Sequence, residues 1–198
     1  MKEKKNPLYS QLSDESLIER AQKGDEQAFN ALYDRHKDRI LNFSYALTGD
    51  REAPWDVLQE TFLYLFKKLP HYRQEAKFTT LLYKVVKNLS ITILRKNRKI
   101  PHSLEEDQAA LLSSDMASPD EIIALEEQKE EFEKILFTLS PTFREVLYLK
   151  IVEALEYSEI AEILDLPLGT VKSRLHYGWK KLVEKLEGKM EINFNKKK

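Results

Sequence analysis

Apolar side chains recur every three or four residues along almost the whole chain, which is the spacing of an amphipathic helix. In the N-terminal half this spacing runs from Phe29 to Leu47, from Leu58 to Leu69 and from Phe78 to Leu89. We find no convincing segment in which apolar and polar residues alternate with a period of two. The sequence therefore predicts an all-α protein.

Glycine and proline indicate where these helices end. Gly24 and Gly49 each precede an aspartate and read as breaks, and Pro70 closes a third helix. The pattern predicts helices near residues 14–23, 26–48, 52–69 and 75–99. These four helices would form an N-terminal bundle, which we assign to residues 10–99.

The stretch 100–118 has no sustained apolar stripe, is acidic and is rich in small polar residues, so we interpret it as a linker. Ser118-Pro119 and Ser140-Pro141 are helix start signals. The pattern beyond the linker predicts helices near 119–137, 141–152, 158–165 and 169–187. The predicted fold is thus all-α, with two small helical bundles joined by an acidic linker, the second over 119–187 and a tail over 188–198.

Charge is segregated along the chain, although the net charge of the 198 residues is only −1. Residues 76–104 contain seven basic residues and no acidic one, whereas residues 105–133 contain eleven acidic residues and a single lysine. Basic residues without acids return over 166–181. This distribution predicts two basic faces separated by an acidic connector.

Composition and motif content argue against several classes of protein. The absence of cysteine excludes disulfides, zinc–cysteine sites and cysteine nucleophiles, and it suits a reducing cytoplasm. The four histidines show no metal-ligand spacing, and no phosphate-binding loop or nucleophile elbow occurs. We expect no enzyme activity, no metal and no cofactor. With no leader-like apolar region and no long apolar run, we also expect no signal peptide and no membrane span.

Residues 156–182 read EYSEIAEILDLPLGTVKSRLHYGWKKL, which is the pattern of a helix-turn-helix. We expect Ser158 to cap the first, short helix, and residues 165–169 to form the turn. The second helix has an apolar face that steps by three or four residues, and we expect Trp179 to belong to the core with it. This face contains Val171, Leu175, Trp179, Leu182 and Leu186.

The other face of the second helix carries basic, hydroxyl and amphipathic side chains. A helix of this kind fits the major groove of DNA, where Arg or Lys pairs with guanine and residues at the helix start contact phosphate. From spacing alone, a basic solvated helix in an ordinary helical hairpin is an open alternative. The candidate DNA-binding residues are Thr170, Lys172, Ser173, Arg174, His176, Tyr177, Lys180 and Lys181.

Four ordered motifs make a more specific resemblance. They resemble motifs of bacterial RNA polymerase sigma factors of the extracytoplasmic-function (ECF) group. The four segments are GDEQAFNALY from Gly24, DVLQETF from Asp56, FTTLLYKVVKN from Phe78 and GTVKSRL from Gly169. The resemblance covers roughly residues 14–186. It implies two domains, region 2 and region 4, and a role in starting transcription.

The resemblance also implies partners. Region 2 docks on the β′ clamp helices of core RNA polymerase, and the positions that match this surface are Asp56, Gln59 and Glu60. Region 4 contacts the β flap and reads the −35 element of promoter DNA, and an anti-sigma factor is a plausible partner. Region 2 also binds the opened strand of the −10 element. The positions that match its strand-binding segment, with two nearby lysines, are Lys84, Lys87, Asn88, Ser90, Thr92, Arg95 and Lys96.

The chain departs from the family pattern at three places. Leu81 stands where the family commonly has tryptophan, which removes a large stacking surface from the −10 segment. Pro54-Trp55 replaces the usual residues before Asp56, and Thr92 stands where the family often has Asp or Asn. Base preference at −10 therefore does not carry over from the family.

Two other functions stay open at this point. A stand-alone helix-turn-helix regulator with an N-terminal sensor domain would leave the Asp56 and Phe78 segments unexplained. A helical interaction protein that never touches DNA would be favoured if all its complexes were indifferent to DNA and to salt, because phosphate contacts make affinity fall steeply with salt.

Overall fold

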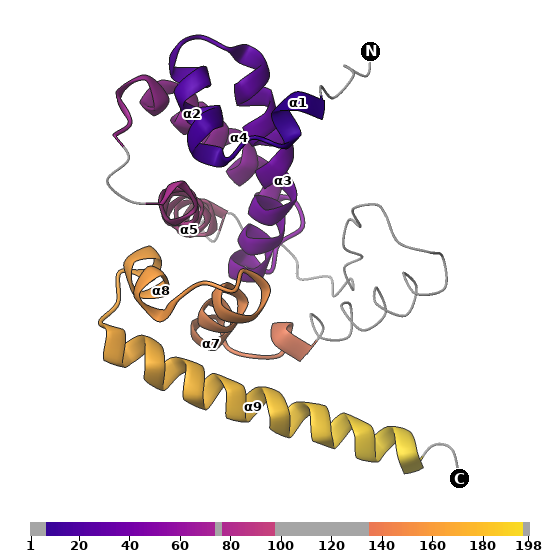
Figure 1. Cartoon of the computed structure of the whole chain (residues 1–198). Coiled ribbons are helices and arrows are strands. Elements are labelled where there is room, and N and C mark those ends of the chain that lie inside the picture. The colour runs from indigo at the N-terminus through magenta and orange to yellow at the C-terminus, as the bar shows by residue number, and fades with distance from the viewer. Residues whose placement is uncertain (1–6, 74–76, 98–134, 196–198) are drawn as a thin grey trace. The chain divides into compact units, whose positions relative to one another are not determined.

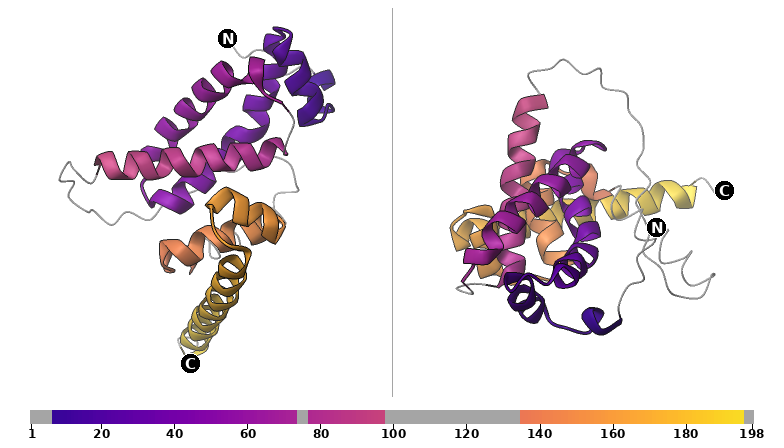
Figure 2. Two further views of the ribbon diagram at one scale, coloured as in Figure 1. Left: turned by 90° about the vertical axis from the view of Figure 1, so that its left-hand side faces the viewer. Right: turned by 90° about the horizontal axis from the view of Figure 1, so that it is seen from above.

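A computed structural model describes residues 7–73, 77–97 and 135–195. The chain divides into two compact units, Met1–His102 and Ser103–Lys198. Within the described ranges all regular structure is helical. The first unit contains α1 (Pro7–Ser10), α2 (Asp14–Gln22), α3 (Glu26–Thr48), α4 (Ala53–Lys68), a 3-10 turn (Leu69–His71) and α5 (Phe78–Asn97). Helices α1 and α2 lie near one end of α3 (Figures 1 and 2).

Helix α3 begins and ends where local chemistry requires it. The Asp25 carboxylate accepts hydrogen bonds from the backbone amides of Gln27 and Ala28 at 3.0 and 3.2 Å, which caps the N-terminus. Gly49 adopts a left-handed conformation with φ of 67° and its amide donates to the Tyr45 carbonyl, which caps the C-terminus. The predicted bounds of 26–48 are confirmed.

The core of the first unit lies between α3, α4 and α5, each of which packs on the other two. Phe43 of α3 and Tyr83 of α5 are fully buried and meet edge to face, with ring centroids 5.2 Å apart. The Ser44 and Ser90 hydroxyls lie 3.1 Å apart within the same core, so they share a hydrogen bond. Helix α5 is thereby held in a fixed rotation relative to α3.

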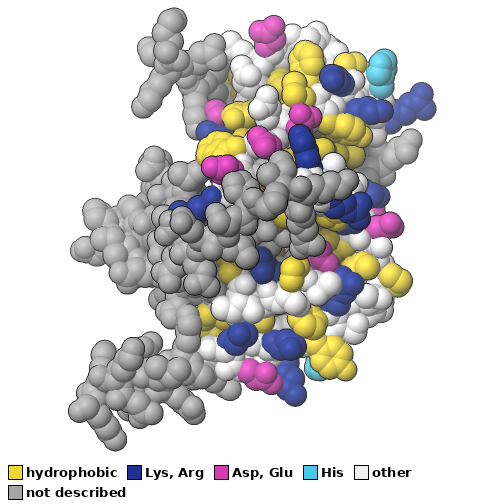
Figure 3. All heavy atoms as spheres, turned by 180° about the vertical axis from the view of Figure 1, so that it is seen from behind, with side chains coloured by type: hydrophobic (Ala, Val, Ile, Leu, Met, Phe, Trp, Pro, Cys, Tyr) yellow, Lys and Arg dark blue, Asp and Glu magenta, His cyan; other side chains and the backbone are white. Residues whose placement is uncertain are grey.

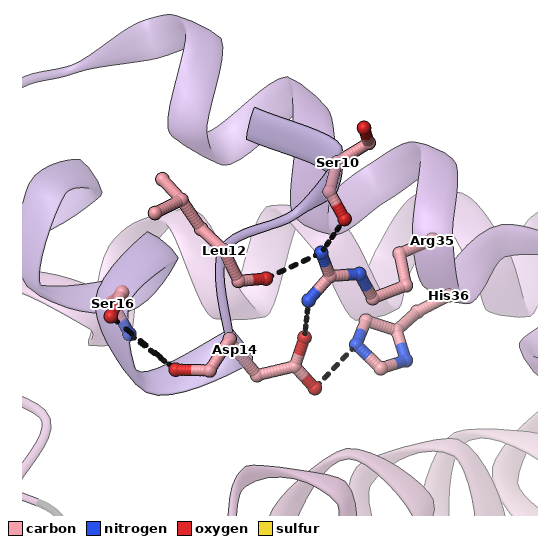
Figure 4. A network of polar contacts seen from close by, with 7 residues as sticks. Ser10, Leu12, Asp14, Ser16, Arg35 and His36 are labelled. Carbon is pink, nitrogen blue, oxygen red and sulfur yellow. Dashed lines mark hydrogen bonds and ion pairs between the residues drawn. The ribbon is translucent and has the colours of Figure 1, made fainter. Parts of the chain in front are cut away.

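Three charged or titratable side chains attach α2 to α3 (Figure 4). Arg35 donates to the Asp14 carboxylate at 2.6 Å and to the Leu12 carbonyl at 2.7 Å. The Nε2 atom of buried His36 lies 2.9 Å from the other Asp14 oxygen. Burial of the Asp14 carboxyl opposes its ionisation, but the hydrogen bonds and charges of His36 and Arg35 outweigh burial, so the pKa of Asp14 is lowered.

The second unit contains α7 (Pro141–Leu147), a π-helical turn (Tyr148–Val152), α8 (Tyr157–Leu164) and α9 (Leu168–Asn195), with α7 and α8 on the same side of α9 (Figure 1). Our expectation that Ser158 caps α8 is wrong. Glu156 is the N-cap, and its amide donates to the Glu159 carboxylate at 2.9 Å as part of a capping box. Glutamate is not one of the usual N-cap residue types, which is why the sequence favoured the serine.

Over the described residues the other predicted helices agree with the structure, with three differences. Helix α1 was not predicted, and the last part of the helix predicted for 141–152 is a π-helical turn. Helix α9 continues past residue 187, where the sequence predicts its end, to Asn195. The predicted linker 100–118 lies outside the described residues, as does the helix predicted for 119–137 except for its last turn at 135–137. The proposed domain bounds stay predictions.

Candidate DNA and polymerase interfaces

The turn between α8 and α9 is fixed by backbone geometry. Asp165 adopts a left-handed conformation with φ of 56°, and the Leu166 amide donates to the Ala161 carbonyl at 3.0 Å. The Pro167 carbonyl then accepts from the Thr170 and Val171 amides at 2.9 and 3.1 Å and opens α9. The break that the sequence predicts over 165–169 is found here, but the turn spans only residues 165–167, because α9 already begins at Leu168.

Helix α9 packs on α7 through a position that the sequence did not single out. Val171, Leu175 and Leu182 are buried as expected, but Trp179 is 53% exposed, so the expectation that Trp179 belongs to the core is wrong. The buried position in this turn is Gly178, where an added Cβ would lie 3.2 Å from Leu147 Cδ1. A glycine in the stripe lets α9 approach α7 closely, and the neighbouring Trp179 then points toward solvent.

The opposite face of α9 is exposed and polar. Lys172, Ser173, His176, Tyr177, Lys180 and Lys181 are all exposed, and Thr170 is half-buried. In Figure 3 Lys and Arg side chains gather over the described part of α9, along the lower edge of the view. Gly169 lies on the same face, one turn before Ser173 and two turns before His176. A Cβ added at Gly169 would meet open space.

Arg174 differs from the other candidate residues on α9 because an acid partner holds it. Its guanidinium donates to the Glu145 carboxylate of α7 at 2.8 Å, and the Arg174 side chain is only 26% exposed. Lys181 lies on the same flank, with its ammonium 5.6 Å from the centre of the Phe143 ring of α7. Arg174 thus joins α9 to α7 in this structure, and a DNA contact would compete with that ion pair.

Helix α5 presents a solvent face of the predicted kind. Lys84, Asn88 and Arg95 lie at helical spacing on one side, and Thr92 follows Asn88 by one turn. Asn88, Thr92, Arg95 and Lys96 are exposed, whereas Lys84 and Lys87 are half-buried. The Thr92 hydroxyl donates to the Asn88 carbonyl at 2.8 Å, which fixes its direction along the helix.

Ser90 does not belong to this face. Its side chain is fully buried and hydrogen-bonded to Ser44, so it is not available to a nucleic acid in this structure. Ser90 continues the buried stripe of Phe78, Leu82 and Val86 at four-residue steps, a signal that was present in the sequence. We therefore remove Ser90 from the candidate DNA-binding residues.

Sequence reasoning missed a second basic group in the first unit. The end of α4 and the turn that follows it expose Lys67, Lys68, His71 and Arg73, which we call the turn cluster. Figure 3 shows basic side chains and a histidine together at the upper right of the view, where this turn lies. The signal was the run KKLPHYR, which holds no acid. Glu75 lies between this run and the acid-free segment that begins at residue 76. The run therefore fell outside the basic segment that the sequence analysis defined.

The candidate polymerase-binding residues lie on the exposed side of α4. Asp56, Gln59 and Glu60 are all exposed and fall within little more than one turn. Gln59 also lines an apolar groove of about 540 Å³ between α3 and α4. The groove is lined by Phe29, Tyr33, Trp55, Leu58, Gln59, Phe62, Leu63 and Phe66.

The groove has an aromatic floor and an exposed apolar rim. The Phe29 ring packs edge to face on Phe62 and Phe66, with centroids 5.9 and 5.6 Å apart. Phe66 and Trp55 are 67% and 54% exposed, an unusual amount for such large apolar side chains. A contiguous apolar surface of this kind is typical of a protein-binding site.

Membrane-spanning and metal-binding features are missing from the described residues. Among them we find no helix long and apolar enough to cross a membrane. The same residues hold no group of three or more histidine, aspartate and glutamate side chains that could bind a metal ion.

Comparisons with known proteins identify both units. Residues 32–100 match the family model of sigma-70 region 2, and residues 129–182 match that of sigma-70 region 4. The chain is 32% identical over 178 residues to the ECF RNA polymerase sigma factor SigW of Bacillus subtilis, covering 85% of this chain and 94% of that protein. It is 29% identical over 175 residues to the ECF RNA polymerase sigma-E factor of Escherichia coli, covering 85% and 91%.

Two solved structures share the fold. The structure of CnrH in complex with the cytosolic domain of CnrY has a TM-score of 0.62 at 20% identity and covers 88% of this chain and 97% of that one. The sigma factor RpoE from Bartonella quintana, solved with the anti-sigma factor NepR, has a TM-score of 0.61 at 22% identity and covers 76% and 91%.

Proposed function

The chain belongs to the ECF group of RNA polymerase sigma factors, and from this premise we propose how its two units divide the work of starting transcription. The second unit reads the −35 element, and the first unit binds core RNA polymerase and holds the opened −10 strand. One observation carries the proposal. Helix α9 of the helix-turn-helix buries one face and exposes a continuous basic and hydroxyl face, which is the arrangement that a major groove requires.

At −35, we assign direct contacts to the exposed residues of α9. Lys172, Lys180 and Lys181 neutralise phosphates or pair with guanine, and each good bidentate pair contributes ~1–3 kcal/mol of discrimination. Ser173 and His176 are exposed on the same face of α9 as Gly169, and we assign them to base edges. Arg174 acts first on packing, because its guanidinium already donates from Nη1 to Glu145 of α7.

At −10, we assign the solvent face of α5 to the single strand. Asn88 offers both a donor and an acceptor to a base edge, while Lys84, Arg95 and Lys96 balance backbone charge. Lys87 and Thr92 complete this segment as flanking residues. The half-exposed Leu81 lies on the same face one turn before Lys84, where the chain presents an aliphatic side chain rather than an aromatic ring.

For core polymerase, we propose a docking surface made of the α3–α4 groove and the acidic side of α4. An apolar centre with a polar rim is the usual anatomy of a specific interface. Asp56 and Glu60 at the rim suit a basic helix, and the β′ clamp helices are the partner that the family implies. Burial of Trp55 and Phe66 in the complex would remove exposed apolar surface of the first unit from water.

A docking experiment tests the polymerase assignment. The variant that carries both Asp56→Lys and Glu60→Lys should lose at least about tenfold in affinity for purified core polymerase, because two attractive charges become repulsive. Glu19→Lys changes an exposed acid on α2 and serves as the matched control. Equal affinity of the double variant and the control would reject the docking surface.

A transcription experiment tests the DNA assignment. Lys172→Ala and Lys180→Ala should lower promoter-specific run-off transcription while affinity for core polymerase stays unchanged. Lys185→Ala removes an exposed lysine later in α9 and serves as the control. Parallel loss of transcription and core binding in the Lys172 variant would reject its assignment to DNA.

Two general expectations belong to the same proposal. We propose that the chain acts in the cytoplasm, where bacterial RNA polymerase works, and that it performs no catalysis of its own. The β flap as the partner of the second unit, and an anti-sigma factor as a regulator, stay predictions for this chain. The stand-alone regulator and the interaction module without DNA binding are disfavoured, because both units match sigma-70 regions.

A further inference from the structure

A side chain of α2 holds the turn that leads from α4 to α5. The Gln22 amide nitrogen donates one hydrogen bond to the Leu69 carbonyl at 2.9 Å and a second to the Tyr72 carbonyl at 2.8 Å. Both protons of the amide are therefore used on main-chain oxygens far along the chain. Gln22 lies ahead of residues 32–100, which match region 2, so the family match assigns it no role.

The carbonyls that Gln22 holds belong to the same turn as the turn cluster. His71 and Arg73 are exposed on either side of Tyr72, and Lys67 and Lys68 precede the turn on α4. A tight turn offers its carbonyls few helical partners, and here the Leu69 carbonyl already accepts from the Tyr72 amide at 3.0 Å. The Gln22 side chain supplies the additional donors that fix the direction of the chain as it leaves α4.

The same turn is connected to the start of α5. The Tyr72 ring meets the Phe78 ring edge to face, with centroids 6.4 Å apart, and buried Phe78 meets His36 of α3 at 5.5 Å. Burial and the negative charge of Glu15 raise the pKa of the Tyr72 hydroxyl, which places this ring within electrostatic reach of α2. Helix α2 thus contacts the turn at its carbonyls, and the turn contacts the start of α5 through the Tyr72 ring.

We propose that Gln22 is a positioning residue for the opening of −10 DNA: its amide sets the turn cluster in place beside α5, so that His71 and Arg73 bind the phosphates of the opened promoter. The proposal rests on the function proposed above for α5. It adds a second basic element to that surface and gives α2 a task in promoter opening. Gln22 does not itself touch DNA in this account.

Because Gln22 is exposed, its replacement leaves the core intact and the hydrogen bonds can be tested alone. Gln22→Met keeps the length and removes both donors, and Gln22→Glu replaces the donors with acceptors. Gln22→Lys restores donors at a similar reach. Gln11→Met changes an exposed glutamine between α1 and α2 and serves as the matched control.

The full chain with purified core polymerase is assayed on a promoter at which the wild-type chain initiates. Affinity for core polymerase is measured with a labelled chain, and opening is measured by permanganate reactivity of −10 thymines. Gln22→Met and Gln22→Glu should reduce opening by about tenfold, since each loses two hydrogen bonds, and should bind core within about twofold of wild type. Gln22→Lys and Gln11→Met should stay within about twofold in both assays.

Three results would overturn the proposal. The first is normal opening by Gln22→Met. The second is a loss of core affinity in proportion to the loss of opening, which would indicate a purely structural role. The third is failure of Gln22→Lys to restore opening. Failure of the wild-type chain to bind core polymerase would instead reject the function on which the proposal rests, so the two failures are distinguishable.

Discussion

Two of the glycines of helix α9, Gly169 and Gly178, have surroundings that differ sharply. At Gly169 no heavy atom lies within 4 Å of the position that a Cβ would take. At Gly178 that Cβ would lie 3.2 Å from Leu147 Cδ1 and 3.3 Å from Phe143 Cβ. Both distances are shorter than ordinary van der Waals contact, and Phe143 Cβ is anchored to the backbone of α7, so it cannot move away alone.

The two alanine substitutions should therefore separate in stability. Alanine gains up to ~1 kcal/mol over glycine inside a helix; this gain applies in full at Gly178, whereas Gly169 is the second residue of α9 and gains less. At Gly178 it is opposed by overpacking, which typically costs ~1–3 kcal/mol. We expect Gly178→Ala to be less stable than Gly169→Ala by up to ~2 kcal/mol, because overpacking at Gly178 exceeds the helix gain there and Gly169 faces open space.

Chemical unfolding measures this difference, and promoter-dependent transcription measures the function of the same variants. Gly169→Ala should be at least as stable as wild type, because the added methyl group meets open space. Gly169 also lies on the side of α9 that we assign to DNA, so this variant should lose about fivefold or more in transcription, as expected for one lost specific contact. Equal stability of the two variants would refute the close packing of α9 on α7. Full activity of Gly169→Ala would refute a close approach of DNA to the start of α9.

Three further predictions concern single residues. Folding lowers the pKa of Asp14, so the ionised carboxylate stabilises the folded state fully above the ordinary pKa of 3.8. This stabilisation is lost as the pH falls through the lowered pKa. When the free energy of unfolding is measured against pH, the wild-type chain should show an extra loss of stability below about pH 4 that Asp14→Asn lacks. Leu81→Trp should increase permanganate reactivity at −10, since stacking on a base contributes ~1–3 kcal/mol, and unchanged reactivity would argue against a strand on this face. Arg174→Met and Glu145→Gln both break the ion pair between α9 and α7, so both should lower the melting temperature. Arg174→Met should also lower transcription. Glu145→Gln keeps the guanidinium of Arg174 and should leave transcription unchanged if Arg174 also contacts DNA.

Much of the fold could be predicted because the signals that set it are local. The Asp25 cap and the left-handed Gly49 lie next to the ends of α3, so the sequence contains both ends of that helix. Helix-turn-helix geometry likewise depends on a short turn between two amphipathic segments. These features require no knowledge of what packs against them.

The errors arose where a neighbour in space decides the outcome. Trp179 and Gly178 are adjacent on α9, and only the close approach of α7 determines that the glycine is buried and the tryptophan exposed. At Ser90 the four-residue spacing from Phe78 already indicated a buried position, but its hydroxyl partner Ser44 is visible only in the structure. The contact of Gln22 with the turn after α4 joins residues about fifty positions apart, and no periodicity reports such a pairing.

Run-off transcription with purified core polymerase tests the central claim most directly. Mapped transcript ends from genomic promoter fragments are compared with and without the full chain. We expect new start sites that appear only when the chain is added and that share common −35 and −10 sequences. An unchanged set of start sites, at chain concentrations that saturate core polymerase, would contradict it.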